Sequence, residues 1–473
     1  MKKQQLPITT GKRSKMLTAA FLLMLLSFMF HSVNVKASHA AGADLTYRWL
    51  QGNQYEVTGT FYRDCDGIAA PATITVNVKS TSCGANQNFV LSQIVPTGQE
   101  ITFPCVSAQT ACTNPNSPLL GYQQYVYRGN ITLPSPGTCA DWVFSYAVVA
   151  RNCAITTMTQ PNPCNSSTSI TPIYVEATLD NLNFNHNNSP TFSNYPVAII
   201  CQNQSFTYNH GGLETDGDVL VYELIDCKTS ATGTVPYISP FSGTNPLTSS
   251  PPVSINSASG DIAMNAQNLE VGIAAVRIKE FRGGVQIGSV IRDIEFYVQN
   301  CNPNILPTAT GINGTNVFSM NACANNPISF FVNSDDQNAG QTVTMTWNNG
   351  ITGATFTIAG SPHPTGTFSW TPTSADVRVA PYTFTVTVRD DNCSNNGFQI
   401  YSYSIYLTQP VPVITGNNPF CAGSSTTLNA GAGFASYSWS TGATSQTIAV
   451  NTAGTFTVTV TDANGCSGSA SAT

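Results

Sequence analysis

The feature that most constrains how this chain folds is a period-two alternation of hydrophobic and polar residues. Residues 382–388 read YTFTVTV, which places large apolar side chains on one face of a strand and threonines on the other. Residues 455–460 read TFTVTV and repeat this form. Only 9% of all residues are charged, and hydroxyl and amide side chains, which favour strands and turns over helices, supply much of the polarity. Because no long segment after residue 37 has a helical period, the sequence predicts an all-β protein.

The two alternating segments belong to an internal repeat. Each is followed by an acidic turn and a cysteine, in VRDDNC ending at Cys393 and in VTDANGC ending at Cys466. A spacing of about 72 residues between equivalent positions is typical of small β-sandwich domains in tandem. A second strand signal lies at Gly283-Gly284, where two alternating segments flank a dipeptide that favours a tight hairpin turn.

Stretches rich in proline and asparagine that lack alternation mark the domain boundaries. We expect four β-sandwich units, of which the last ends within its final strand, so that the chain is a fragment of a longer protein or a truncated open reading frame. The predicted segments are a leader at 1–37 and units at 38–185, 186–303, 304–410 and 411–473.

The N-terminus has the pattern of an export signal. Five basic residues lie within the first 15, an apolar run covers 16–30, and the small residues Val35 and Ala37 stand where a signal peptidase reads. We predict cleavage after Ala37. The alternative is an uncleaved anchor, but a helix of this length spans about 22 Å, short of the roughly 30 Å of a bilayer core.

Cysteine usage agrees with export. All 14 cysteines follow the leader, and an even number in an exported chain predicts a closed disulfide framework without free thiols. Zinc binding is the weaker alternative, because no CxxC pair occurs and the histidines are not spaced to complete a site. Most of the ten cysteines from Cys65 to Cys301 cannot be paired from sequence. The predicted pairs, two bracketing single units and one closing a short loop, are Cys323–Cys393, Cys421–Cys466 and Cys105–Cys112.

Acidic turns raise the question of calcium. Ca²⁺ needs several oxygen ligands, and alternate carboxylates around Gly217 in ETDGDVLVY would supply some of them. The alternative is an ordinary turn, in which Asp side chains bond to nearby backbone N–H groups. Both interpretations stay open, and no other cofactor is expected. The tentative calcium ligands are Glu214, Asp216 and Asp218 in one turn, and Asp335, Asp336, Asp390 and Asp391 in two turns expected to meet at one end of the third unit.

The sequence contains no recognisable catalytic motif, so we predict a protein that is not an enzyme. His210, near Asp216 and Asp218, is expected to be an isolated surface histidine. After the leader the chain carries 12 basic and 24 acidic side chains, which argues against nucleic acid and anionic lipid as partners. The tryptophans fit core packing better than a sugar-stacking platform, because one or two fall in each unit. They are Trp49, Trp142, Trp347, Trp370 and Trp439.

Several long segments resemble a known group of proteins. The segments SHAAGADLTYRWLQGNQYEVTGTFYRDCDG, ETDGDVLVYEL and RIKEFRGGVQIGSVIRDIEFYVQNC are similar to the N-terminal half of large exported proteins of gliding Bacteroidota, which commonly carry polycystic-kidney-disease-type (PKD) and immunoglobulin-like repeats. The third unit, with GTFSWTPTSADV, resembles their cadherin-like repeats. The fourth, with FCAGSSTTLNA and YSWSTGATSQTI, resembles their immunoglobulin-like repeats.

The resemblance implies a cell-surface adhesin or gliding-associated stalk, located on the outer surface and exported by the type IX secretion machinery. Its partner would be a surface receptor or a glycan of unknown identity. The alternative function is that of an extracellular glycan-binding accessory protein. Such proteins usually end in a sorting domain, which is a further reason to expect a fragment here.

Overall fold

The computed structural model describes residues 40–67, 69–102, 105, 108–149, 151–159, 171–393, 396–417 and 424–473. The predicted leader and its cleavage site lie outside the described residues. In the described part, strands dominate and the helical segments are two short 3₁₀ turns, η1 (Ile312–Gly314) and η2 (Ser374–Asp376). This confirms the all-β prediction. None of the described helices is long and apolar enough to cross a membrane.

The first two predicted units supply seventeen strands. Those before residue 185 are β1 (Ala40–Gln51), β2 (Gln54–Asp64), β3 (Thr73–Ser80), β4 (Ala85–Gln93), β5 (Gln99–Glu100), β6 (Tyr122–Thr132), β7 (Trp142–Val148) and β8 (Ile173–Leu179). Those after it are β9 (Thr191–Phe192), β10 (Val197–Cys201), β11 (Phe206–Asn209), β12 (Gly212–Leu213), β13 (Val219–Ile225), β14 (Ser254–Ile255), β15 (Asp261–Met264), β16 (Val271–Arg282) and β17 (Val285–Gln299).

One sheet runs through both of these units, so they are not the two separate sandwiches predicted. The ladder β1-β2-β6-β4-β3-β7-β8 continues to β17, and β17 pairs back with β1, which closes a ring of eight strands. One edge of β17 bonds in turn to β8, β1 and the parallel β10, while β16 pairs along its other edge. The predicted boundary at residue 185 therefore falls inside a continuous sheet. The polar stretch at this position marks a surface loop. It does not separate two domains, because β17 completes the sheet that the first unit leaves open.

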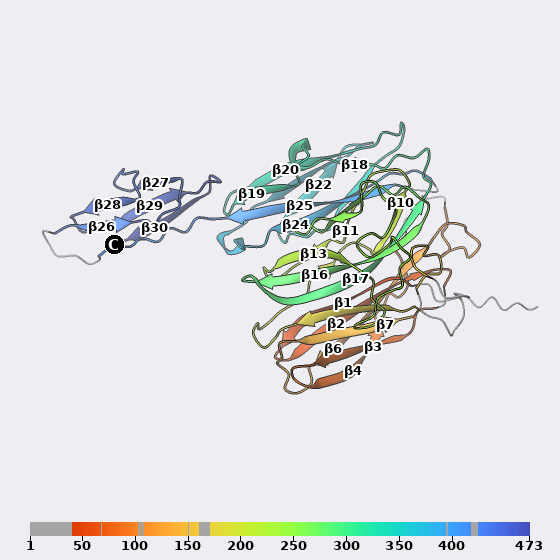
Figure 1. Cartoon of the computed structure of the whole chain (residues 1–473). Helices are drawn as coiled ribbons and strands as arrows, with labels where there is room; N and C mark the ends of the chain where they lie inside the picture. The colour runs from red at the N-terminus through yellow and green to blue at the C-terminus, as the bar shows by residue number, and fades with distance from the viewer. Residues whose placement is uncertain are drawn as a thin grey trace, which may run out of the picture.

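The Gly283-Gly284 hairpin is confirmed. Arg282 pairs with Val285 across the turn, and both glycines have positive φ angles, 59° and 83°. These angles are those of the tight turn that matches the twist of two antiparallel strands. The hairpin joins β16 and β17, the two longest strands of the second unit, and Figure 1 shows them beside β13 and next to β1.

The third unit is a sandwich of two four-stranded sheets, ordered β18-β20-β23-β22 and β19-β25-β24-β21. The predicted alternation holds in β24, where Phe384, Val386 and Val388 are buried. Phe384 stacks on Phe368 with ring centroids 4.9 Å apart, within an aromatic core. The strands are β18 (Thr308–Ala309), β19 (Ser319–Cys323), β20 (Ile328–Asp335), β21 (Thr344–Trp347), β22 (Thr355–Ala359), β23 (Thr365–Trp370), β24 (Tyr382–Arg389) and β25 (Phe398–Thr408).

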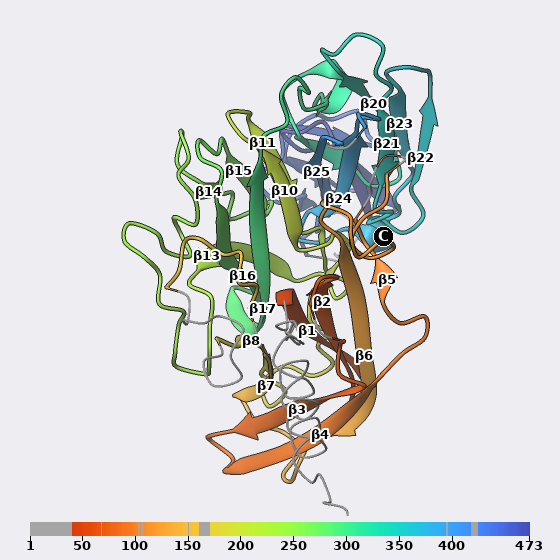
Figure 2. The same cartoon turned by 90° about the vertical axis from the view of Figure 1, so that its right-hand side faces the viewer.

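The third unit packs directly on the second, as both views show (Figures 1 and 2). Ile400 belongs to the same buried cluster as the core of the first two units. Ser402 donates a hydrogen bond to Asp261 at 2.7 Å, and the Gln399 side chain accepts one from the Thr207 backbone at 3.1 Å. The described residues between 40 and 408 therefore form one packed assembly, which we call the body.

The fourth unit is a small sandwich with sheets β26-β28 and β27-β29-β30. Figure 1 shows it projecting from the end of β25, away from the first two units. Its core surrounds Trp439, which is 3% exposed. The strands are β26 (Thr426–Asn429), β27 (Ser436–Trp439), β28 (Thr447–Val450), β29 (Phe456–Thr461) and β30 (Ser467–Ala472).

The disulfides differ from the predicted pairs. Cys323 and Cys393 do not pair with each other, Cys105 does not pair with Cys112, and Cys466 does not pair with Cys421, which itself lies outside the described residues. The two cysteines that follow the acidic turns stand at the ends of their units, where the nearest cysteine in space belongs to a neighbouring unit. The described bonds are Cys65–Cys112, Cys83–Cys139, Cys105–Cys393, Cys201–Cys301 and Cys323–Cys466.

The expectation of no free thiol is also wrong. Cys227 forms no disulfide and is fully buried, in an apolar cluster with Ile155 and Met158. Burial raises the pKa of the Cys227 thiol well above its usual range, and the charge of Asp293 adds to this. A buried neutral thiol of this kind acts as a small apolar core residue.

Candidate functional site

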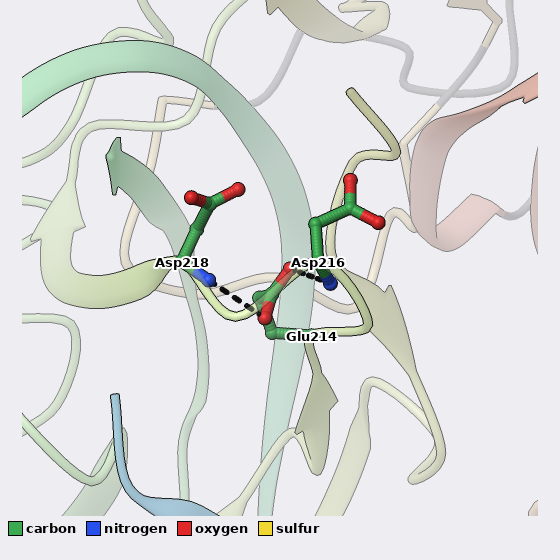
Figure 3. A group of neighbouring side chains, drawn as sticks. All are labelled: Glu214, Asp216 and Asp218. Atoms are coloured by element: carbon green, nitrogen blue, oxygen red, sulfur yellow. Dashed lines mark hydrogen bonds between the residues drawn. The ribbon is translucent and has the colours of Figure 1, made fainter. Parts of the chain in front are cut away.

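The first predicted calcium turn does bring its three carboxylates together. Glu214, Asp216 and Asp218 each place one carboxylate oxygen within 4.8 Å of the others. Figure 3 shows the Glu214 carboxylate turned toward the backbone nitrogens of the turn, from which it accepts hydrogen bonds of 2.5 Å from Asp216 and 2.9 Å from Asp218. Glu214 therefore closes the turn on itself, as the alternative of an ordinary acidic turn requires.

Arginine already supplies positive charge at this turn. Arg282 donates two hydrogen bonds to the Asp218 carboxylate, at 2.8 and 2.6 Å, and Arg378 lies 3.7 Å from Glu214. Asp216 accepts hydrogen bonds from the backbone and the side chain of Asn188 at 2.7 and 2.6 Å. A bidentate guanidinium uses the same oxygens that a cation would need. Calcium would have to displace Arg282 in order to bind Asp218.

The second predicted group lies in two turns that meet at one end of the third unit. Burial raises the pKa of Asp336, and the charges of Asp335 and Asp391 contribute to the rise. Burial likewise raises the pKa of Asp390, with a contribution from Asp336. Among the described residues, however, only Glu214, Asp216 and Asp218 bring three carboxylate oxygens within 4.8 Å of one another.

Several oxygens of the second group accept hydrogen bonds from the turns themselves. Asp390 accepts hydrogen bonds from the backbone of Asn392 and Gly397, and Asp391 accepts one from the backbone of Thr342. Asp335 faces His363, with 3.3 Å between their side-chain atoms. One oxygen of Asp336, Oδ2, is buried without a hydrogen-bond partner.

A pocket of about 420 Å³ lies where the first three units meet. This volume is within the range of small-molecule sites, which often form between domains. Its walls come from the loop after β5, from the segment between β9 and β11 with β6 beside it, and from the outer face of β21, β24 and β25. No single unit contains the pocket, so the packing of the body creates it.

The wall from the third unit is a regular patch on one sheet face. Thr346 pairs with Thr387, and Thr387 with Ile400, in one row across three strands. Thr344 pairs with Arg389, and Arg389 with Phe398, in the neighbouring row. Cross-strand neighbours of this kind lie about 4.5–5.5 Å apart and point to the same side. The patch thus presents three hydroxyls, one guanidinium and two apolar groups to the pocket.

Among the described residues that line this pocket, Arg389 is the only charged one. Its guanidinium lies 5.2 Å from the centre of the Phe398 ring. Burial lowers the pKa of Arg389 to about 10, and the charge of Asp390 partly offsets this. The side chain therefore stays protonated at neutral pH and places a positive charge in a partly desolvated site.

The opposite wall is held by hydrogen bonds inside the protein. The Tyr122 hydroxyl donates to Glu295 at 3.1 Å, and the Tyr208 hydroxyl donates to the Tyr195 carbonyl. Their rings line the pocket while their polar atoms are used elsewhere. The Asn194 carbonyl accepts a hydrogen bond of 2.6 Å from the buried Arg292. This wall is therefore fixed by the core behind it.

A disulfide joins two walls of the pocket. Cys105 follows the lining residues Ile101 and Thr102 of the first unit, and Cys393 follows Arg389 of the third. No pattern in the sequence predicts this pocket, because its residues come from segments as far as about 300 positions apart. The one local signal was the threonine face of the β24 alternation, which predicts an outward face but not what covers it.

Two further expectations are settled by burial. Trp142, Trp370 and Trp439 are buried, which agrees with a role in core packing, whereas Trp49 and Trp347 are half-buried against the cores of their units. His210 is not the surface residue expected, because it is fully buried with its ring nitrogen 3.5 Å from Arg292. Burial lowers the pKa of His210 well below its usual range, and the charge of Arg292 adds to this.

No protein-family model and no curated protein matches the sequence. Among solved structures, the N-terminal four immunoglobulin domains of a Dscam1 isoform are similar at 11% identity and a TM-score of 0.23, covering 90% of this chain and 98% of that one. An ICAM-5 ectodomain fragment is similar at 10% identity and a TM-score of 0.22, covering 91% of this chain and 97% of that one. An endo-fucoidan hydrolase of glycoside hydrolase family 107 is similar at 14% identity and a TM-score of 0.16, covering 67% and 39%. These likenesses concern strand architecture alone.

Proposed function

We propose that the protein is a non-enzymatic, extracellular adhesion-type protein that holds a binding surface away from the cell on disulfide-linked β-sandwiches. The observation that carries this proposal is that disulfides join different units: Cys105–Cys393 within the body, and Cys323–Cys466 between the third and fourth units. Such bonds persist in oxidising compartments and are rare in the cytosol.

The disulfide pattern also suits a chain under tension. A force pulling on the C-terminus reaches Cys466 and then passes through the bond to Cys323, which bypasses the 143 positions of backbone between them. Because Cys105–Cys393 also ties this segment to the first unit, the bond is isolated in the variant Cys105→Ser with Cys393→Ser. In single-molecule stretching of that variant, loss of the Cys323–Cys466 bond should release about 500 Å of additional length, at ~3.5 Å per residue. Adding Cys323→Ser and Cys466→Ser to that variant should show the added length without reductant.

Surface location is the decisive test. Full-length protein expressed in a gliding Bacteroidota host should be labelled on intact cells by a membrane-impermeant amine reagent, because Lys79 is exposed on β3. Non-reducing peptide mapping of the same material should recover the Cys105–Cys393 peptide. Recovery of unlabelled protein with reduced cysteines from the cytosol would contradict the proposal. Beads coated with the purified protein should then resist detachment by flow more than beads coated with reduced, alkylated protein.

We further propose export by the type IX route and a role in gliding, on the basis of the resemblance described above. Cells that lack this secretion machinery should lose surface labelling and keep the protein inside the envelope. Calcium binding at Glu214, Asp216 and Asp218, and at the turns containing Asp336 and Asp390, stays a prediction. The second candidate function, a glycan-binding accessory protein, is favoured by the pocket in the body.

A further inference from the structure

We propose that the pocket between the first three units binds a saccharide that carries an anionic group, either a carboxylate or a sulfate. The inference rests on the proposed function in one respect: the saccharide would be the molecule to which the body adheres. Thr346, Thr387 and Arg389 on the sheet face, with Phe398 beside them, would make the specific contacts.

The sheet face offers hydroxyls that the protein itself does not use. Thr344, Thr346 and Thr387 form no side-chain hydrogen bond with any described residue, although each lines the pocket. Thr344 and Thr346 are exposed, so a ligand can reach them from solvent. A hydroxyl both donates and accepts, which matches the mixed donor and acceptor character of sugar hydroxyls. Because strands fix their positions, these groups are arranged before a ligand arrives.

The charge favours an anion on that sugar. Arg389 occupies the row next to Thr346 and Thr387, and a guanidinium binds carboxylate and sulfate oxygens through parallel N–H groups. No acidic side chain is among the described residues that line the pocket. An anionic sugar would gain a charge-assisted hydrogen bond from Arg389, in a site partly shielded from water, that a neutral sugar cannot form.

The aromatic groups favour a sugar ring over a peptide. The rings of Phe398 and Tyr195 line the pocket, and an aromatic face packs well against the apolar C–H face of a sugar. A peptide strand would dock by pairing with a sheet edge, which uses backbone groups. The lining groups of the third unit are side chains on one face of β21, β24 and β25, and not backbone groups of a sheet edge.

Calorimetric titration of the oxidised full chain tests the inference. The probes are oligogalacturonate for the carboxylate, a sulfated galactose oligomer for the sulfate, and neutral galactose oligomers of equal length. We expect at least one anionic probe to bind tenfold or more tightly than the neutral one, with affinity falling as salt is raised. Equal affinity for neutral and anionic probes, or no binding of either anionic probe at 10 mM, would overturn the inference.

Variants locate the site. Arg389→Gln should weaken binding of the anionic probe by roughly 10- to 100-fold, and Thr346→Val by roughly 3- to 10-fold. The matched controls are Arg277→Gln on β16 and Thr427→Val on β26, which lie outside the pocket and should leave affinity unchanged. If Arg389→Gln does not fold, Thr346→Val and Thr387→Val carry the test. Unchanged affinity in the pocket variants would show that the probe binds elsewhere and overturn the assignment.

The outcome separates this inference from the proposed function. If the protein is labelled on the cell surface and mediates bead adhesion but binds none of the three probes, the saccharide inference is wrong and the adhesion role stands. If the protein binds an anionic probe but is found only inside the cell, the adhesion role is wrong and the saccharide inference stands.

Discussion

The body and the fourth unit are both built from β-sandwich sheets, yet their cores use different chemistry. In the fourth unit the buried cluster is apolar around Trp439, and Thr426 is the buried polar side chain among its described residues. In the body, β17 is buried on both faces and still carries Arg292, Asp293 and Glu295. Each needs a partner, and the partners come from distant segments.

These partners explain why the first two units cannot be separated. Arg151, which follows β7, binds the Asp293 carboxylate through two hydrogen bonds of 2.7 Å. Asp44 on β1 lies 3.1 Å from Arg292. A version of β17 in another register would leave these charges buried and unpaired, at a cost of several kcal/mol. We expect no comparable dependence of the fourth unit on its neighbour, because the apolar core formed by its described residues lies within the unit.

The largest expected effect is on the buried ion pair of the body. Asp293→Ala should lower the free energy of unfolding by about 3–5 kcal/mol, because it leaves the Arg151 guanidinium buried without its carboxylate. Native-state hydrogen exchange of β17 peptides measures the loss, and β29 peptides of the fourth unit should not change. Replacing the pair together, Arg151→Met with Asp293→Leu, should recover much of it.

Glu223→Ala is the matched control for that variant. Glu223 binds Arg277 and Lys279 at 3.0 and 2.9 Å, but the three side chains are about one-third exposed. Solvent screening should limit the loss to less than about 1 kcal/mol. Equal losses for Asp293→Ala and Glu223→Ala would mean that burial of an ion pair does not raise the cost of removing one of its partners.

A cavity in the fourth unit should have a local effect. Leu428→Ala removes a side chain that is 3% exposed and should cost about 2–4 kcal/mol. In a unit of this size that loss is enough to unfold it. Limited proteolysis should then release fragments from residues after 411 and leave the body intact. Fragmentation of β17 as well would show that the body depends on the fourth unit, contrary to the comparison.

The body should also respond to pH in a way the fourth unit does not. Burial raises the pKa of Glu295 to about 8, and the Asp64 carboxylate adds to this. Since the unfolded pKa is near 4.5, the folded state retains a proton that the unfolded state loses between these values. Stabilisation by Glu295 is therefore complete below about pH 4.5 and is lost as the pH rises through 8, at up to about 1.4 kcal/mol per pH unit.

Hydrogen exchange of β17 peptides between pH 5 and 8, corrected for the intrinsic exchange rate, measures this slope. Glu295→Gln cannot ionise and should flatten it. An unchanged slope in Glu295→Gln would assign the pH dependence to other groups.

The smallest effect we expect is that of calcium on the body. Binding at Asp218 must compete with the bidentate contact from Arg282, so millimolar Ca²⁺ should stabilise the body by less than about 1 kcal/mol. Arg282→Gln should enlarge the shift in melting temperature, and Asp216→Asn added to it should remove the gain. A large shift in the unmodified protein would show that calcium displaces the arginine.

The sequence by itself determined what depends on neighbouring residues. Alternation along β24 and β29 specified strands and their buried faces, because successive side chains of a strand point to opposite sides. The dipeptide Gly283-Gly284 specified the β16–β17 hairpin, because a tight turn needs positive φ angles at both positions. The acidic turn at Glu214 was also found as a group, because its three carboxylates lie within five residues.

Only the tertiary structure decided which strands and which cysteines meet. Alternation does not name a partner strand, so the sequence left open that β17 would close the ring begun by β1. For the same reason the sequence pattern predicted the pair Cys323–Cys393. Packing at the unit ends instead joins Cys393 to Cys105 and Cys323 to Cys466. The pocket follows from that packing. Its walls approach one another only after the body has formed, because a site between units is specified by contacts between surfaces and not by any local pattern.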